Sequence, residues 1–235
     1  MALTDWLISY YKADTGAWTT LFDNVWTNDW TISWATWTTG KIGDGLSFDW
    51  VNDNVNLWNI FNFSWTSPFS ISAWVYYTWY GWYIISKFAS WISGQWIFDT
   101  SRVNTFIMSR EVAPWKLESP AVLNINQWNH IVWAYDWIAM RLYHNWILVA
   151  WPQNSWSVAN NARNVRIWSD DNNSSYYNWI IDEIWVWNRA LTSTEITELY
   201  NNWEWLSYPF IQPSTKKWNI FFWFGAGAGI TPVNP

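Results

Sequence analysis

The feature that most constrains the fold is a succession of short β-type runs separated by clusters of Asn, Asp, Ser, Thr and Gly. Runs of this kind at close spacing are typical of an antiparallel sandwich or barrel. Several alternate in polarity, so that Met140, Leu142 and His144 share one face of their run. The sequence predicts strands over residues 7–11, 41–48, 55–57, 69–77, 83–87, 96–99, 105–110, 128–135, 140–144, 147–150, 165–168 and 180–187.

A short helix is expected after the last strand. Thr192 and Glu195 have the spacing of a capping box, and Ile196, Leu199 and Tyr200 follow as one apolar stripe. The predicted fold is therefore all-β, a two-sheet antiparallel sandwich with one short C-terminal helix packed on a sheet. Residues 1–210 are predicted to form this domain. Residues 211–235, with the stretches QPSTKK and GAGAGITPVNP, are predicted to form a flexible tail.

Composition excludes several classes of protein. The chain has no Cys, which rules out disulfides and thiolate metal sites. Its net charge of −6 argues against a nucleic-acid partner held through phosphates. No stretch reaches the roughly 18 uncharged apolar residues of a membrane-spanning helix, so no membrane insertion is expected. The first residues also lack the basic region and apolar run of a secretory signal.

Tryptophan is the compositional anomaly, with 29 Trp against only 9 Gly in 235 residues. Residues 140–150 show the conflict, because two predicted strands meet at Asn145-Trp146. A two-residue hairpin turn favours Asn-Gly, since both of its residues have positive φ, which a Trp rarely adopts. Seven Trp residues in all follow Asp or Asn, where glycine is the usual turn residue. They are Trp6, Trp30, Trp50, Trp137, Trp146, Trp179 and Trp203.

We hypothesise that most of these Trp residues are glycine in the natural protein. A genetic code that reads UGA as glycine, translated with a table that reads it as tryptophan, would produce this pattern. Trp74, Trp128 and Trp187 instead fit strand positions that bury an aromatic ring. The alternative is a protein that is truly rich in Trp, such as a sugar binder with many stacking platforms.

Read with this substitution in mind, motifs along residues 5–210 resemble the laminin-G-like, concanavalin-A-like jelly-roll lectin domains. The matching stretches are LISYYKAD, GKIGDGLSFDWVND, FSISAWV, WNHIVWAYDW, LYHNWILVA and IIDEIWVWNRALTSTEI. In that family the positions of Trp50, Trp137, Trp146, Trp179 and Trp185 are typically Gly. The resemblance implies two antiparallel sheets in a jelly roll and a role in carbohydrate or protein recognition.

The sequence offers little for catalysis. A retaining glycosidase on a related jelly roll would need two close carboxylates, typically Glu-x-Asp-x-x-Glu on one strand, and no such motif is present. The nearest pair, Asp182 and Glu183, is expected on opposite faces of its strand. His130 is expected to be packed in an apolar strand, and His144 to be exposed before its turn. We therefore expect a protein that is not an enzyme.

A structural Ca²⁺ is one expectation, because this ion prefers carboxylate and amide oxygens in turns. Asp49, Asn52, Asp53 and Asn54 lie close together in the sequence, and the family resemblance implies that Asp49 and Asp182 match acidic positions. The predicted metal ligands are Asp49, Asp53 and Asp182. The alternative is that Asp49 and Asp53 only accept hydrogen bonds from turn amides.

Two loops are candidates for ligand contact, since their amides, carboxylates and aromatic rings could bind and stack on a sugar. An ordinary solvated loop is the alternative for each. The predicted ligand-binding residues are Asp170, Asp171, Asn172, Asn173, Tyr176 and Tyr177 in one loop and Tyr80 in the other.

Together these features predict a non-catalytic, lectin-like carbohydrate-binding or adhesion module whose partner is a glycan or a glycosylated surface. The expected location is extracellular, on a cell surface or on a virion. The alternative is a structural or decoration protein of a phage or cell-surface assembly, in which the same sandwich makes protein contacts.

Overall fold

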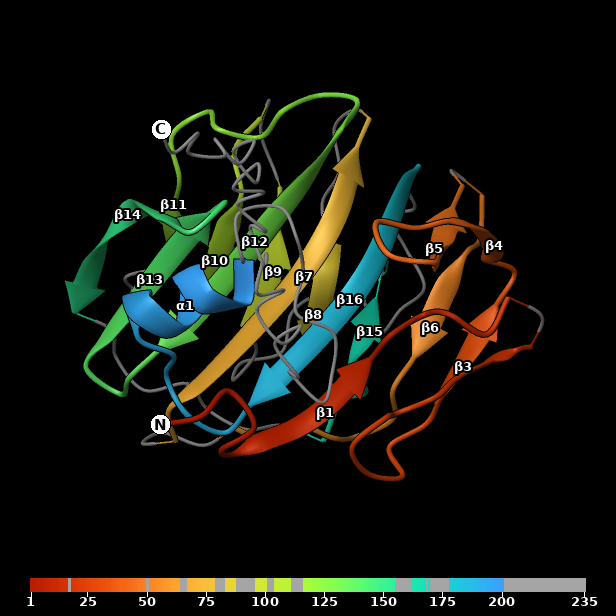
Figure 1. Cartoon of the computed structure of the whole chain (residues 1–235), viewed down its shortest axis with the longest axis horizontal. Helices are drawn as coiled ribbons and strands as arrows, with labels where there is room; N and C mark the ends of the chain where they lie inside the picture. The colour runs from red at the N-terminus through yellow and green to blue at the C-terminus, as the bar shows by residue number, and fades with distance from the viewer. Residues whose placement is uncertain are drawn as a thin grey trace, which may run out of the picture.

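The computed structural model describes residues 1–16, 18–49, 51–63, 67–78, 83–87, 96–100, 104–110, 116–154, 162–167, 169 and 178–200. These residues form two antiparallel sheets packed face to face (Figure 1). Sheet A has the order β14 (Ile147–Asn154), β13 (Ala139–His144), β12 (Gln127–Tyr135), β7 (Phe69–Tyr77), β16 (Trp179–Trp187), β5 (Asp44–Phe48) and β4 (Thr36–Thr39), with β1 (Leu7–Tyr11) also paired to β16. Sheet B has the order β11 (Lys116–Glu118), β10 (Ile107–Arg110), β9 (Trp96–Asp99), β8 (Tyr83–Lys87), β15 (Arg166–Ile167), β6 (Asn54–Asn56), β3 (Trp30–Ser33) and β2 (Thr20–Leu21).

The main core lies between the sheets and follows the period of two along each strand. In β7, Phe69, Ile71 and Val75 belong to this core, while the intervening Ser72 and Trp74 face the other side of sheet A. β12 pairs with β7 along its whole length, from Gln127 opposite Tyr77 to Tyr135 opposite Phe69. The centre of sheet A is thus a long, regular ladder buried on its inner face.

A second apolar cluster covers part of the outer face of sheet A, where the helix α1 (Ser193–Tyr200) lies in front of the strands (Figure 1). Ile196 and Leu199 pack there with Leu3 and Leu7 of the N-terminal segment. The predicted capping box is confirmed, since the Glu195 N–H donates to Thr192 Oγ1 at 3.2 Å and Glu195 Oε2 accepts from the Thr192 N–H at 2.9 Å.

The hairpin turn has the backbone that the sequence predicts, with φ of 45° at Asn145 and 67° at Trp146. Among the described residues, four further Trp have positive φ, a conformation that glycine adopts freely and a bulky side chain rarely adopts. They are Trp6 at 62°, Trp34 at 69°, Trp58 at 56° and Trp137 at 64°. All four are exposed. Trp179 and Trp185 differ, since they are buried in β16.

The predicted jelly-roll sandwich with one short helix is confirmed, but four short strands were not expected. These are β2, β3, β4 and β11, of two to four residues each. In β3, Trp30 was interpreted as a turn residue because it follows Asp29, although Trp30 and Ile32 alternate with Thr31 as a strand requires. The predicted tail, residues 211–235, lies outside the described residues.

Two expectations about side-chain orientation were wrong. The register of β16 shifts between Asp182 and Trp185, so Ile181 and Ile184 both face the main core and the two acids between them face away from it together. This β-bulge overrides simple alternation. His144 is buried rather than exposed, because Asn129 Oδ1 lies 2.9 Å from its Nε2 and the ring of Phe106 packs nearby.

No helix in the described part of the chain is long and apolar enough to cross a membrane.

Candidate functional site

The loop residues predicted to contact a ligand lie outside the described residues. These are Asp170, Asp171, Asn172, Asn173, Tyr176 and Tyr177, together with Tyr80. The proposed contacts of these loops therefore stay predictions.

Two of the predicted metal ligands lie together in the turn between β5 and β6. Asp53 Oδ2 accepts a hydrogen bond from the Asp49 N–H at 2.7 Å, and Asp49 Oδ1 accepts one from the Val51 N–H at 2.8 Å. Burial raises the pKa of Asp53, and the hydrogen bond from the Asp49 amide only partly offsets this. Both carboxylates thus bind turn amides, which is the arrangement of the alternative interpretation.

Asp182 lies elsewhere, beneath the turn between β4 and β5. Its Oδ2 accepts hydrogen bonds from the N–H groups of Lys41 at 2.8 Å and Ile42 at 2.9 Å. A Cβ at Gly40 would lie 2.7 Å from the same oxygen, so only glycine allows this close approach. Burial raises the pKa of Asp182. Its contacts show that Asp182 anchors the GKIG turn.

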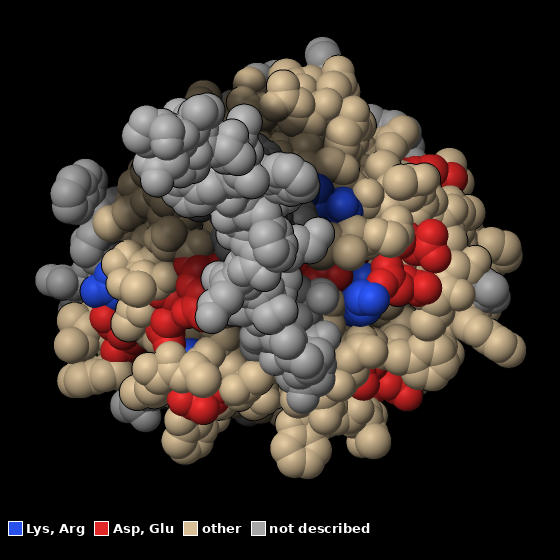
Figure 2. All heavy atoms as spheres, in the orientation of Figure 1, with Lys and Arg blue, Asp and Glu red and all other residues tan. Residues whose placement is uncertain are grey.

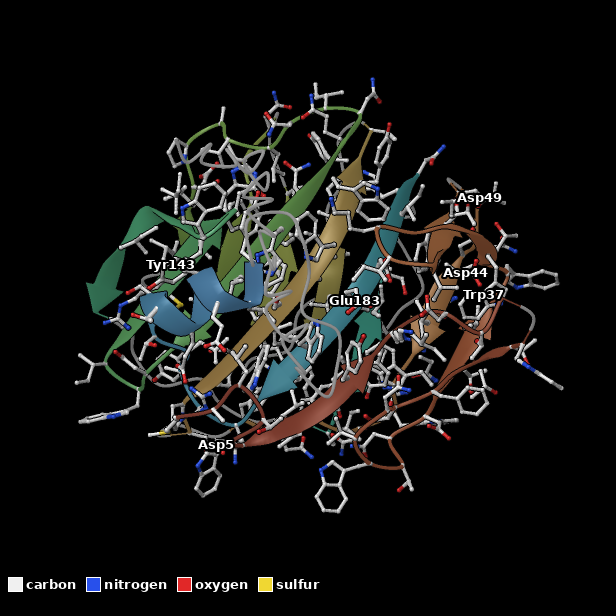
Figure 3. All side chains as sticks on the ribbon, viewed as in Figure 1. Asp5, Trp37, Asp44, Asp49, Tyr143 and Glu183 are labelled. Atoms are coloured by element: carbon white, nitrogen blue, oxygen red, sulfur yellow. The ribbon has the colours of Figure 1, made fainter. Side chains whose placement is uncertain are left out.

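The structure does not bring Asp182 together with the other two acids. Phe48 pairs with Trp179, so Asp49 lies level with residue 178, four residues and about 13 Å from Asp182 along β16. Figure 3 shows the same separation, with Asp49 beyond the end of β5 and Glu183 in the middle of sheet A. Among the described residues, no group of three or more His, Asp or Glu side chains could hold a metal ion.

A buried Ser–His pair on the outer face of sheet A looks at first like a catalytic pair. Ser72 Oγ lies 2.7 Å from His130 Nε2, but both side chains are buried. Burial lowers the pKa of His130 to about 3, with a smaller contribution from His144. The imidazole is therefore neutral at ordinary pH and lies within the packing of Trp74 and Tyr200. As expected from the sequence, His130 is a packed residue.

A candidate site that the sequence did not predict lies on the outer face of sheet B. Ile32, Val55 and Ile167 point into the core from neighbouring strands β3, β6 and β15, so the residues between them point outward. The register aligns Thr31, Asn56 and Arg166 in one row across the three strands. Ser33 and Asn54 form a second row.

These two rows form the floor of a surface cavity of about 320 Å³. Arg166 Nη1 donates to Asn54 Oδ1 at 3.1 Å, which holds the guanidinium across the floor. The indoles of Trp34 and Trp58, 74% and 58% exposed, stand at the edges. We call the floor residues Thr31, Ser33, Asn54, Asn56 and Arg166 the sheet B floor.

The chemistry of the sheet B floor is that of a hydroxyl-binding surface. Two hydroxyls, the Asn56 amide and the guanidinium of Arg166 present donors, and the hydroxyls can also accept. The amide of Asn54 is buried and bonded to Arg166 and to the Asn52 carbonyl, and Asn56 Oδ1 accepts from the Trp58 N–H. Among the described residues that line the cavity there is no Asp or Glu. The size falls at the lower end of the range of small-molecule sites. The arrangement suits a ligand with several hydroxyl groups in a plane.

The charged side chains on the face of the molecule in Figure 2 are scattered. On the face in Figure 2, Asp and Glu side chains form small groups with single Lys or Arg side chains nearby, and the described atoms show no continuous basic surface. The net charge of −6 agrees with this.

Comparison with protein families gives one match. The model of a family described as the concanavalin A-like lectin/glucanases superfamily matches residues 49–197, more than half of the chain. No curated protein sequence matches the chain.

Solved structures share the fold at low sequence identity. The binding domain of Paraclostridial Mosquitocidal Protein 1 is 14% identical with a TM-score of 0.69, over 86% of this chain and 53% of that one. Domain 4 of AbnA, an extracellular arabinanase from Geobacillus stearothermophilus, was solved in complex with arabinotriose and is 16% identical with a TM-score of 0.66. The match covers 82% of this chain and 97% of that one. Trypanosoma rangeli sialidase is 14% identical with a TM-score of 0.65, and the match covers 84% of this chain and 33% of that one. The chain thus spans about half of the binding domain of the mosquitocidal protein and a third of the sialidase.

Proposed function

Because the chain belongs to the concanavalin A-like lectin/glucanases superfamily, we propose that it is a non-catalytic carbohydrate-binding module. The observation that carries this proposal is the sheet B floor, where three adjacent strands present hydroxyl, amide and guanidinium groups in register. Sugars are bound by such planar sets of donors and acceptors, and the register of a sheet fixes the spacing between them. The domain of AbnA, which shares the fold, was solved with a bound arabinose oligosaccharide.

The proposal includes the absence of catalysis. Hydrolysis of a glycosidic bond by the usual route needs two carboxylates that both reach the sugar. Among the described residues, the adjacent pair Asp182 and Glu183 is fully buried, and no carboxylate lines the cavity above the sheet B floor. This geometry supports binding of a glycan without its cleavage.

The glycan partner we propose is a neutral oligosaccharide on an extracellular, cell-surface or virion-associated structure. A binding role there is an adhesion role. Ca²⁺ at the turn that holds Asp49 and Asp53 would be structural, since this turn is separate from the sheet B floor.

A glycan array with and without Ca²⁺ tests the proposal. Thr31→Val removes one floor hydroxyl with little change in shape, and Thr36→Val on β4 of sheet A is its matched control. We expect the protein to bind neutral oligosaccharides. In Thr31→Val the affinity should fall about tenfold, which corresponds to a loss of about 1.4 kcal/mol in binding free energy, and in Thr36→Val it should be unchanged. Absence of binding under both conditions would overturn the proposal and favour the structural or decoration role. Hydrolysis of the bound glycan would overturn its non-catalytic part.

A further inference from the structure

Lys87, the last residue of β8, has its ammonium group inside the molecule, and the residue is only 2% exposed. Its Nζ donates to Asn59 Oδ1 at 2.7 Å, to Asn62 Oδ1 at 2.6 Å and to the carbonyl oxygen of Ile60 at 2.9 Å. A buried ammonium is costly unless it is hydrogen-bonded. These bonds hold the segment 59–62, which follows β6, against β8.

The lysine also fixes the orientation of the two amides. An ammonium can only donate, so each Asn must turn its Oδ1 toward Lys87 and its Nδ2 away from it. Asn59 and Asn62 are exposed, and one N–H of Asn62 is used in a bond of 3.3 Å to the carbonyl oxygen of Asn59. The remaining amide N–H groups are directed away from Lys87, on residues that are exposed. Because each Oδ1 accepts from a cation, its amide is polarised and its N–H groups become stronger donors.

These amides line a surface cavity of about 430 Å³ that is distinct from the one above the sheet B floor. Its wall continues with the polar side chains of Asn28 and Asn188 and with apolar contacts from Ile8, Phe61 and Phe63. Among the described residues in this wall there is no Asp or Glu. The cavity therefore offers fixed donors on one side and an apolar surface on the other.

We propose that this cavity, here called the Lys87 cavity, is a second ligand site that binds the carboxylate of an acidic sugar. A carboxylate is the strongest common acceptor for outward N–H donors, and hydrogen bonds to it are shorter and stronger than those to a hydroxyl. The apolar wall fits the C–H face of a sugar ring. A phosphate is a poorer match, because phosphate sites usually present Arg forks or a helix N-terminus, and neither is among the described residues of this wall.

The carbohydrate class of this ligand rests on the proposed function, whereas the preference for a carboxylate rests only on Lys87 and the two amides. The test uses tri-galacturonate and its methyl ester, which keep the same rings and differ in the charge of the carboxylate. Binding is measured by isothermal titration calorimetry on the whole chain.

Asn59→Asp and Asn62→Asp are the informative variants. An Asp has the shape of Asn and still accepts from Lys87, but it turns an oxygen outward where the amide nitrogen was. Asn124→Asp, on the exposed loop before β12, is the control for the added charge. We expect tri-galacturonate to bind at least about tenfold more tightly than its methyl ester. Each informative variant should bind tri-galacturonate about tenfold more weakly without loss of thermal stability. Asn124→Asp should bind it with unchanged affinity.

The outcomes separate the two proposals. The Lys87 cavity is supported if Asn59→Asp weakens the binding of tri-galacturonate and Thr31→Val leaves it unchanged. This holds even if neutral glycans fail to bind. Equal affinity for acid and ester, or unchanged affinity in both Asp variants, overturns it. Binding of neutral glycans alone overturns the Lys87 cavity and leaves the proposed function standing. Binding of neither overturns both.

Discussion

At the scale of single residues, tryptophan at positive φ is the clearest conflict between sequence and backbone. Trp6, Trp34, Trp58, Trp137 and Trp146 all have this conformation. A side chain with a Cβ pays about 1–2 kcal/mol for it, and glycine does not. The buried indole N–H groups of Trp96 and Trp133 also find no hydrogen-bond partner in the part of the chain that the structure describes. Both observations support the proposal that many of these positions are glycine in the natural protein.

Trp137→Gly is the simplest test of this conflict in the folded chain. Trp137 has φ of 64° and is 58% exposed, so glycine relieves strain while little packing is lost. We expect the free energy of unfolding to rise by about 0.5–1 kcal/mol, measured by urea denaturation. Trp26 is 67% exposed and its φ is not positive, so Trp26→Gly is the control and should not stabilise. Equal effects of the two changes would refute the strain argument.

The nucleotide sequence tests the recoding proposal itself. We expect UGA at Trp6, Trp34, Trp58, Trp137 and Trp146, where the backbone has the glycine conformation. We expect UGG at Trp74 and Trp187, which are fully buried in strands β7 and β16. UGG at the positive-φ positions would end the proposal and favour a protein that is truly rich in Trp.

At the scale of elements, two buried histidines make the stability of the central strands depend on pH. Burial lowers the pKa of His144 in β13 to about 4 and that of His130 in β12 to about 3, from an ordinary value of 6.5. The unfolded chain therefore binds protons that the folded chain excludes. This stabilising contribution is complete above pH 6.5 and is lost as the pH falls toward 4 and 3.

Each His contributes a fall of about 1.4 kcal/mol per pH unit to the unfolding free energy between pH 6 and pH 4, and the raised pKa values of Asp182 and Glu183 act against this fall. His144→Gln keeps a donor for Asn129 Oδ1 but does not titrate. The slope of its unfolding free energy against pH should therefore be smaller by the contribution of about one proton. Urea denaturation at a series of pH values measures both slopes. An unchanged slope would contradict the burial of His144.

The bulge in β16 has the opposite dependence on pH. Glu183 has φ of 49°, is fully buried, and accepts a hydrogen bond from the Tyr10 hydroxyl at 2.7 Å. Burial raises the pKa of Glu183, with a further contribution from the charge of Asp182. Its contribution to stability is therefore complete below its ordinary pKa of 4.5 and is lost as the pH rises.

Glu183→Gln keeps the acceptor for Tyr10 and removes the ionisation. We expect the melting temperature of Glu183→Gln, relative to that of the chain without this substitution, to increase steadily from pH 5 to pH 8. One kcal/mol corresponds to about 2–4 °C for a chain of this size, so differential scanning fluorimetry resolves the trend. A difference that does not change with pH would show that Glu183 titrates normally.

At the scale of the whole molecule, sequence patterns predicted the sandwich because its long strands are regular. β1, β7, β8 and β9 have the expected bounds, since each is rich in β-branched and aromatic residues and is bounded by turn signals. β3 and β4 were missed because each has only four residues and Trp30 follows Asp29, as a turn glycine would. The bulge at Glu183 was missed because one extra residue in a strand leaves no local sequence signal.

The sheet B floor could not be predicted for a different reason. Thr31, Asn56 and Arg166 are far apart in the sequence and meet only through the register of β3, β6 and β15. Register is set by tertiary packing and not by local pattern. The same holds for Lys87, whose partners lie in a loop 25 to 28 residues earlier.

The central claim is that the sheet B floor binds a glycan, and mapping the bound surface by heteronuclear NMR tests it most directly. Titration with the best neutral glycan from the array should shift the amide signals of Thr31, Asn54, Asn56 and Arg166. The double variant Trp34→Gly and Trp58→Gly should give the same map with affinity within about threefold, because the polar floor and not the indoles carries the binding. Shifts confined to sheet A and α1 would contradict the claim.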